Sequence, residues 1–420
     1  MNNPVETMTQ KLARLKLKNR NRNLERARSH SRAAKRSSQQ RIQSRSRVQA
    51  ESRIRRRSAP RRHPVTSEEK EMKIDIENLE NLPLDILQTI FMSMSIKEIS
   101  RNCKLSEKFN ALCKRESLWR QKVFNYGVTD KIEATWRKTA MIISTGFKQV
   151  SAGTDYSIAL RYDGTLVGWG SNRQNLISDT PRDSDFKQVS ASVWHVISLR
   201  EDGTLVSWGS NRHDQVSDTP RGSDFKQVSA SVWHSVALRE DGTLVSWGLD
   251  EDGLVSNTPK DSDFKQVSAG RWFSVALREN GTLVSWGSDE DDLVSNTPGG
   301  SDFKQVFAGS FHSVALREDG TLVSWGLDEV SQVSDTPRGS GFKQVSAGLE
   351  HSVALREDGT LVSWGYDYYG QVSDTPRGSG FKQVSAGTRH SVAIRKNVTL
   401  VSWGNDENGE VSDTPTRSHP

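Results

Sequence analysis

The chain has 420 residues, and its 58 Lys and Arg against 52 Asp and Glu give a formal net charge of +6. Two cysteines, Cys103 and Cys113, are too few for a disulfide framework, so we expect none and infer a reducing, intracellular compartment. No run of 18 apolar residues occurs, which excludes a hydrophobic membrane-spanning helix and predicts no membrane partner.

The first 64 residues differ from the rest in charge. They contain 20 Lys and Arg and three Glu, a net charge of +17, whereas the remaining residues have a net charge of −11. With so few apolar residues, we expect a disordered basic Arg/Ser-rich tail over residues 1–66. Residues 11–62 are predicted to contact nucleic acid or an import receptor, which favours a nuclear or cytoplasmic location. A solubilising tail or an organelle transit peptide are the alternative interpretations.

Residues 79–124 show helical periodicity. Pro83 stands in the first turn of a predicted helix whose apolar residues recur at Ile86, Leu87, Ile90 and Phe91. "SIKE" at 95–98 is a capping box that opens a second helix. We expect a helical domain over 75–126 and a helical linker over 127–146. So small a domain buries little surface, so its apolar faces require a partner.

This helical segment resembles an F-box. The family's opening pattern, "LPxxILxxIF", is matched from Leu82 to Phe91, and its closing Leu-Trp pair by Leu118 and Trp119. The resemblance implies docking on the Skp-type adaptor of cullin-based ubiquitin ligases; a structural helical linker is the alternative. The residues that it assigns to adaptor binding are Leu82, Pro83, Ile86, Leu87, Ile90 and Phe91.

From Phe147 onward the chain repeats itself. Seven units start at phenylalanines 39 residues apart, from Phe147 to Phe381. Each contains the β-rich runs "FKQVSAG", "HSVALR" and "GTLVSWG" or close variants, the last two joined by a hairpin signal, and then a Pro- and Gly-containing return. One unit cannot bury its own apolar face. The predicted fold is therefore mainly β, a seven-bladed β-propeller with three-stranded blades over 147–420.

The hairpin signal changes in the last unit. Six units place Gly at the second position of what we predict to be a type I′ turn, where φ is positive. The seventh reads "RKNVTL" and places Val398 there, a β-branched residue for which positive φ is strained. A different or longer turn around Asn397 is expected.

The repeated unit resembles the regulator of chromosome condensation repeat family. "SAG", "HSVAL" and "DGTLVSWG" carry the likeness, and the 39-residue length resembles the family's short branch. Its members include nucleotide-exchange factors, chromatin binders, ligase subunits and inhibitors. The resemblance implies a propeller fold, while function depends on the sites that the propeller presents. The wedge associated with nucleotide exchange has no counterpart, because no unit contains an insertion.

One loop position varies from unit to unit and includes consecutive aromatic residues. If each blade is an antiparallel meander, this position and the loop after "SWG" lie on one face of the propeller. Interface cores favour aromatic residues and Arg. Shielding of the blade below is the alternative interpretation. The predicted client-binding residues are Trp194, Trp233, Trp272 and Phe311.

Catalytic patterns are missing from the sequence. It contains no Gly-rich phosphate loop, nucleophile elbow or Cys/His cluster, so we expect a protein that is not an enzyme and binds neither metal nor cofactor. The histidine repeated in five units is replaced by Tyr156 and Phe273 in the other two, which indicates packing. The repeated Trp of "SWG" has the same interpretation.

The expected function is substrate recognition in an SCF-type, cullin-based ubiquitin ligase. The F-box would recruit the Skp-type adaptor and the cullin ligase core, and the propeller would hold an unidentified client protein. The alternatives are a chromatin or nucleic-acid associated propeller protein and a protein inhibitor without a ligase role.

Overall fold

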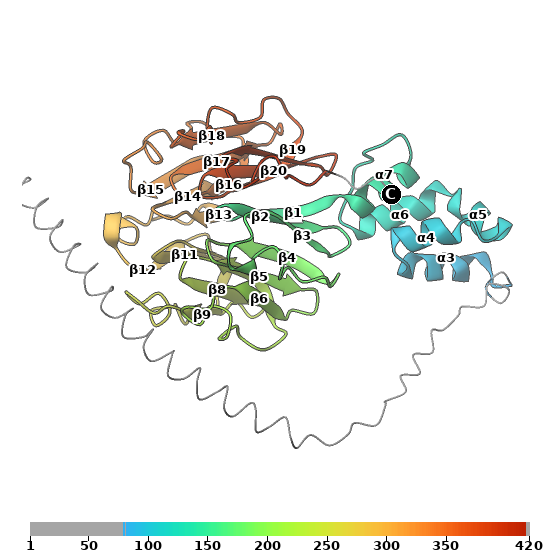
Figure 1. Ribbon diagram of the computed structural model, residues 1–420, viewed down its shortest axis with the longest axis horizontal. Helices are drawn as coiled ribbons and strands as arrows, with labels where there is room; N and C mark the ends of the chain where they lie inside the picture. Colours follow the sequence, from blue (N-terminus) through green and yellow to red (C-terminus); the bar gives the residue numbers. More distant parts are fainter. Residues whose placement is uncertain (1–78, 80, 417–420) are drawn as a thin grey trace, which may run out of the picture. The chain divides into compact units, whose positions relative to one another are not determined.

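The computed structural model describes residue 79 and residues 81–416, in which five α-helices precede 21 strands (Figure 1). The predicted basic tail lies outside these residues. The helices are α3 (Leu84–Ser93), α4 (Ile96–Asn102), α5 (Glu107–Cys113), α6 (Glu116–Asn125) and α7 (Trp136–Thr145).

The helices begin where polar caps stand. Ser95 caps α4: its Oγ accepts a hydrogen bond from the Glu98 amide at 3.2 Å, and its own amide donates to the Glu98 carboxylate at 2.7 Å. Hydrogen bonding of the charged carboxylate by Ser95, chiefly by its backbone amide, lowers the pKa of Glu98. The predicted capping box is therefore confirmed. Ser106 and Thr135 cap α5 and α7 in the same manner with one bond each.

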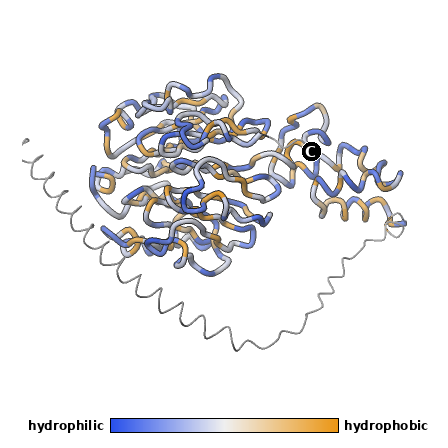
Figure 2. Tube along the Cα trace, in the orientation of Figure 1, coloured by the Kyte–Doolittle hydropathy of each residue, from blue (hydrophilic) through white to orange (hydrophobic). Residues whose placement is uncertain are grey.

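All five helices share one core, and α3 is hydrophobic over most of its length (Figure 2). The fully buried residues of this core include Leu87 of α3, Trp119 of α6 and Ile143 of α7. The Trp119 indole donates to the Cys113 carbonyl at 2.7 Å, so even its polar atom is satisfied inside the core. Helix α7 is thus packed as part of the helical domain.

Cys103 and Cys113 form a disulfide, with their Cα atoms 5.8 Å apart. Our expectation of no disulfide was wrong. Cys103 caps the end of α4 and Cys113 ends α5, and both side chains point into the same core. Ten residues separate them in sequence, and only the packing of the two helices brings them within bonding distance.

The propeller consists of seven three-stranded antiparallel sheets, each made from one repeat, which confirms the predicted fold class. The first strands are β1 (Phe147–Ala152), β4 (Phe186–Ala191), β7 (Phe225–Ala230), β10 (Phe264–Ala269), β13 (Phe303–Ala308), β16 (Phe342–Ala347) and β19 (Phe381–Ala386). The second are β2 (Tyr156–Arg161), β5 (His195–Arg200), β8 (His234–Arg239), β11 (Phe273–Arg278), β14 (His312–Arg317), β17 (His351–Arg356) and β20 (His390–Arg395). The third are β3 (Leu166–Gly170), β6 (Leu205–Gly209), β9 (Leu244–Gly248), β12 (Leu283–Gly287), β15 (Leu322–Gly326), β18 (Leu361–Gly365) and β21 (Leu400–Gly404).

The first strands of all seven blades line a central channel. We call the end where second and third strands are joined by a hairpin the hairpin face, and the opposite end the variable face. On the hairpin face, each blade is tied to the next by a backbone bond, such as the Phe186 amide to the Gly164 carbonyl at 3.2 Å.

Neighbouring blades pack through the repeated Phe, Val and Trp. Between blades 2 and 3, Phe225, Val228 and Trp247 pack with Ile197 and Leu199. The Trp247 indole also donates to a carbonyl of the preceding blade at 2.9 Å. All seven tryptophans of "SWG" are only 4–6% exposed. They are packing residues between blades, as predicted.

Blade 7 closes the ring against blade 1 with the same contacts. The Trp169 indole donates to the Glu410 carbonyl at 2.9 Å, and the Phe147 amide to the Val398 carbonyl at 3.1 Å. Each blade takes its three strands from one repeat, so the described strands of the first and last repeats are not exchanged.

The hairpin turns differ from the predicted type. In blade 3 the Gly242 amide donates to the Arg239 carbonyl, and only Gly242, at φ 85°, has positive φ in this turn. A type I′ turn would need positive φ at both central residues; this is a three-residue loop that ends in a left-handed residue. Val398 occupies that last position in blade 7 with φ 62° and the same hydrogen bond. The expected deviation around Asn397 was therefore wrong.

Candidate functional sites

The structure divides the predicted adaptor-binding residues into two groups. Leu87 and Phe91 are 0% and 1% exposed, and the Phe91 ring meets the Phe109 ring edge-on at 5.5 Å. They hold α3 in the core and do not reach the surface. Pro83 and Ile86 are exposed. The remaining two, Leu82 and Ile90, are half-buried.

Two apolar residues absent from the prediction join the exposed group. Leu84 is 37% exposed and Leu105, in the turn before α5, is 50% exposed. The Lys108 ammonium donates to the Leu82 carbonyl at 2.8 Å, which ties the start of α5 to the start of α3. We call Pro83, Leu84, Ile86 and Leu105 the apolar patch. Leu84 and Leu105 do not belong to the matched F-box pattern. Their large apolar side chains, at positions outside the helical periodicity, were the only sign in the sequence that they could be exposed.

The loops after the first and third strands of each blade meet on the variable face. The Ser210 amide donates to the Trp194 carbonyl at 2.8 Å, the Leu249 amide to Trp233 at 3.0 Å, and the Leu327 amide to Phe311 at 2.9 Å. The predicted client-binding residues therefore stand among the most variable loops of the chain, on one face.

Three of the four predicted aromatic residues lie together. The Trp233 and Trp272 ring centroids are 5.5 Å apart, and the Arg271 guanidinium lies 5.9 Å from the Trp272 ring and 5.3 Å from the Phe311 ring. All three aromatic side chains are half-buried. We call Trp233, Trp272 and Phe311 the aromatic cluster. Sequence reasoning missed Arg271, although its place directly before the variable position was a signal.

Polar atoms in this cluster are incompletely satisfied. The Trp233 Nε1 and the Arg271 Nε are buried and have no hydrogen-bond partner among the described residues. Burial also lowers the pKa of the Arg271 guanidinium, because desolvation disfavours its charged form. A partner that placed a hydrogen-bond acceptor beside these two N–H groups would offset part of the cost of their desolvation.

Trp194 belongs to a separate pocket of about 240 Å³, between blades 1, 2 and 7. Asp155, Arg173 and Arg389 also line it, and an Arg173–Asp155 ion pair of 3.6 Å crosses it. Burial raises the pKa of Asp155, and repulsion from Glu410 adds to that effect. The four aromatic residues therefore do not form one arc. Trp233, Trp272 and Phe311 form the aromatic cluster, and Trp194 lines a separate pocket with charged residues.

The repeated histidines take part in packing between blades. All five are fully buried, and each Nε2 lies 2.7–2.8 Å from a serine hydroxyl of the next blade. Burial lowers the pKa of each histidine, to about 3 or 4, so the rings are neutral at physiological pH. The residues are His195, His234, His312, His351 and His390.

Comparison with known families identifies both parts of the chain. The F-box domain model matches residues 79–121. The regulator of chromosome condensation (RCC1) repeat model matches residues 147–175, 186–215, 225–254, 264–291, 303–332, 342–371 and 381–410. The chain is an F-box protein with an RCC1-repeat propeller.

Solved propellers resemble this F-box protein in fold. The ectodomain of the Physcomitrella patens receptor kinase CR4 has a TM-score of 0.53 at 19% identity, over 62% of this chain and 74% of that chain. The CRINKLY ectodomain of the Arabidopsis thaliana receptor kinase ACR4 has a TM-score of 0.53 at 19% identity, over 63% of this chain and 97% of that chain. Prp20p from Saccharomyces cerevisiae, described with its binding to Gsp1p and histones, has a TM-score of 0.51 at 20% identity. The match covers 65% of this chain and 86% of that chain. No curated protein sequence matches the chain.

Both modules of the F-box protein suggest interaction with other proteins. The F-box suggests binding to an SCF adaptor, and the repeats suggest a protein-binding propeller. Within residues 81–416, His, Cys, Asp and Glu side chains form no group able to hold a metal ion. Of the helices in this part of the chain, none has the length and apolar character needed to cross a membrane.

Proposed function

We propose that this F-box protein is the substrate-recognition subunit of a cullin-based ubiquitin ligase. The F-box docks the Skp-type adaptor through the apolar patch, and the propeller binds a client protein on its variable face. The observation that carries this proposal is the F-box at 79–121 with large apolar side chains exposed at its first helix.

The apolar patch has the character of a docking surface. Leu84, Ile86 and Leu105 are three of five large hydrophobic residues that are exposed among the described residues. Their helices are held rigidly by the shared core, so little ordering is needed when a partner binds. Buried apolar anchors at interfaces contribute about 1 to 4 kcal/mol each.

The variable face has the character of a client-binding surface. The aromatic cluster offers large, rigid side chains of low conformational entropy, and the channel-lining strands hold its loops in place. The acidic loop residues Glu251, Glu290 and Glu329 follow the third strands of blades 3, 4 and 5, beside the cluster. A client segment with apolar and basic residues is complementary to this surface.

Adaptor binding is tested by replacing exposed residues of α3. We expect Leu84→Ala with Ile86→Ala to weaken co-purification with a Skp-type adaptor at least tenfold, because two anchors are lost. Thr89→Ala is the matched control, since Thr89 is exposed on the same helix and polar. An unmodified chain that binds no adaptor would refute the ligase proposal.

Client binding is tested with two pairs of tryptophans. We expect Trp233→Ala with Trp272→Ala to abolish client capture while the melting temperature changes little. Trp208→Ala with Trp247→Ala, between blades, should instead destabilise the fold by about 3 to 5 kcal/mol per site. Equal destabilisation by both pairs would mean that the aromatic cluster is core packing.

The basic tail over residues 1–64 is proposed to direct the protein to the nucleus or to contact nucleic acid, because its charge of +17 requires no fold to act. Deleting it should abolish nuclear accumulation, measured by fluorescence microscopy of a tagged chain. Unchanged location after deletion would contradict this role.

A further inference from the structure

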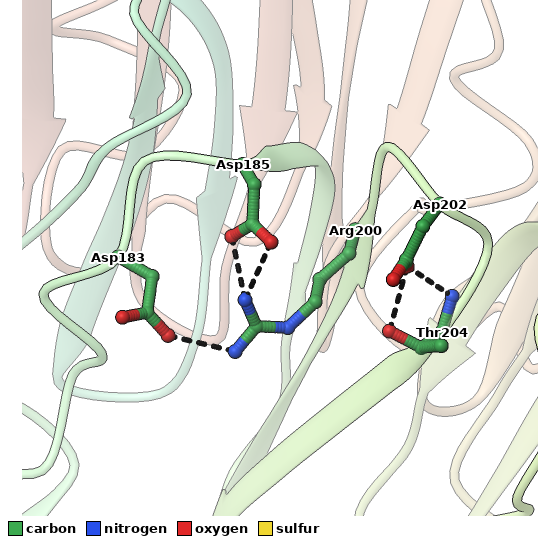
Figure 3. A network of polar contacts seen from close by, with 5 residues as sticks. All are labelled: Asp183, Asp185, Arg200, Asp202 and Thr204. Carbon is green, nitrogen blue, oxygen red and sulfur yellow. Dashed lines mark hydrogen bonds and ion pairs between the residues drawn. The ribbon is translucent and has the colours of Figure 1, made fainter.

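On the hairpin face, an arginine ends each second strand, and in blades 2 to 5 it has a characteristic set of partners. In blade 2, Arg200 donates to both oxygens of Asp185 at 2.7 and 2.6 Å and to Asp183 at 2.7 Å (Figure 3). Its guanidinium also lies 4.9 Å from the Phe186 ring. The aromatic ring fixes the plane of the guanidinium, and the carboxylates meet its N–H groups.

Blades 3, 4 and 5 repeat this arrangement. Arg239 pairs with Asp224 at 2.5 Å, Arg278 with Asp263 at 2.6 Å, and Arg317 with Asp302 at 3.4 Å. The aspartate in each case stands directly before the first strand of its blade. In four blades, therefore, the arginine at this position binds a carboxylate.

Blades 6 and 7 keep the arginine and lack the aspartate. Gly341 and Gly380 stand at the aspartate positions. Arg356 and Arg395 lie 4.5 Å from the rings of Phe342 and Phe381, so the guanidiniums are held as in the other blades. Within residues 81–416, neither arginine forms an ion pair, whereas the equivalent arginines of blades 2 to 5 all do.

The surrounding residues make this part of the hairpin face basic. In blade 7, Lys396 replaces the glutamate that blades 2 to 6 carry in the hairpin, and Asn397 replaces an acidic residue in most of them. Residues 336–343, 356–360, 375–382 and 395–399 contain seven cations and two anions. The equivalent residues of blades 4 and 5 contain five cations and six anions. The cations of this basic sector are Arg338, Lys343, Arg356, Arg377, Lys382, Arg395 and Lys396.

The two arginine positions are adjacent on one surface. The Phe381 amide donates to the Gly359 carbonyl of the blade 6 hairpin at 3.0 Å, and the Lys396 amide donates to the Gly380 carbonyl at 2.7 Å. These backbone bonds join both hairpins and the intervening return loop. Lys382 is partly engaged, because it donates to the Tyr162 hydroxyl at 2.8 Å and burial lowers its pKa to about 8. Arg338, Arg377 and Lys396 are exposed.

We propose that the basic sector of blades 6 and 7 binds an acidic peptide segment of a partner protein. Its Asp or Glu carboxylates engage Arg356 and Arg395 as aspartates engage the equivalent arginines in blades 2 to 5. The surface lies opposite the aromatic cluster, so this proposal does not depend on how the client is bound. The observed pairs favour a peptide over a nucleic-acid backbone, because the groups that engage the equivalent arginines in blades 2 to 5 are carboxylates and not phosphates.

The test uses the full-length protein and a labelled peptide of alternating Asp and Gly, with fluorescence anisotropy as the readout. We expect Arg356→Gln with Arg395→Gln to weaken binding at least about tenfold, since charge-assisted bonds to both guanidiniums are lost. Arg221→Gln with Lys260→Gln is the control, because it removes two exposed cations from the return loops that lead into blades 3 and 4 on the same face. An unchanged melting temperature verifies that both variants are folded.

A second variant uses the protein's own repeats. Lys396→Glu restores the residue that five other blades carry, so it should fold normally and still weaken peptide binding several-fold. Equal losses in the arginine pair and in the control pair would overturn the proposal, because binding would then be unspecific attraction to positive charge. A greater loss for an oligonucleotide than for the peptide would overturn it in favour of nucleic acid.

Discussion

A single hydrogen bond between neighbouring blades varies around the ring. Five blades place a buried histidine against a serine of the next blade. Tyr156 instead faces a blade with Val196 at the serine position, and its hydroxyl donates to the His195 carbonyl at 3.3 Å. Phe273 leaves the Ser313 hydroxyl buried without a hydrogen-bond partner among the residues that the structure describes. The fold therefore tolerates loss of this bond at a cost of about 1 to 3 kcal/mol.

These histidines predict acid sensitivity. Their folded-state pKa values lie below the 6.5 of a free imidazole, so below about pH 6.5 the unfolded chain binds more protons than the folded chain. Stability should be fully present above that pH and fall by about 1.4 kcal/mol per pH unit for each histidine as the pH decreases towards their folded-state pKa values. Urea unfolding at several pH values measures this slope.

A variant isolates one histidine's contribution. His351→Phe recreates the pair seen at Phe273 and Ser313, so we expect it to fold. Between about pH 6 and 5 its stability should fall less steeply than that of the unmodified chain, by about 1.4 kcal/mol per pH unit. Identical slopes would show that His351 is not held neutral in the folded protein.

The junction of α7 and blade 7 is unusually tightly packed. Val398 adopts φ 62°, a strained conformation for a β-branched residue, yet its side chain is only 1% exposed. Gly146, directly after α7, packs on it so closely that a Cβ at Gly146 would overlap Val398 Cβ and Cγ2. The burial of Val398 offsets the backbone strain, which the turn pattern alone did not reveal.

This junction supports a double-mutant prediction. Gly146→Ala should destabilise the protein by about 1 to 3 kcal/mol, because the stiff Val398 side chain cannot move aside. Val398→Gly removes the overlap and the positive-φ strain, so the double variant should be more stable than the sum of both single changes predicts. Thermal unfolding of the four proteins measures the coupling; strict additivity would contradict the contact.

Sequence reasoning succeeded where residues repeat and failed where distant residues meet. Seven copies of the Phe and Trp positions made the strand order and the packing residues readable. The Cys103–Cys113 disulfide, the Leu84 and Leu105 part of the apolar patch and the Arg271 contact depend on how separate segments pack. Local patterns contain no information on such distances. The hairpin type was misassigned because Asp-Gly fits both a two-residue and a three-residue loop.

The closing contact between blades 7 and 1 matches the contacts between the other neighbouring blades. Trp169 and Trp208 each donate to a preceding-blade carbonyl at 2.9 Å, although 241 and 32 residues separate the partners. Trp169→Phe and Trp208→Phe should therefore destabilise the protein equally, by about 1 to 3 kcal/mol each. Chemical denaturation compares them; a much smaller effect at Trp169 would mean that the ring is open in solution.

The same closing contact sets a requirement during translation. At roughly 5 to 20 residues per second, the ribosome needs about 15 to 50 s to proceed from Phe147 to Glu410. During that time the side of blade 1 that packs against blade 7 is uncovered. The almost identical repeats can meanwhile compete to pack against the same blade. The helical domain is made first, and its Tyr126 packs edge-on against Tyr162 of blade 1. A contact between the end of the helical domain and blade 1 is therefore available well before the last blade has been made.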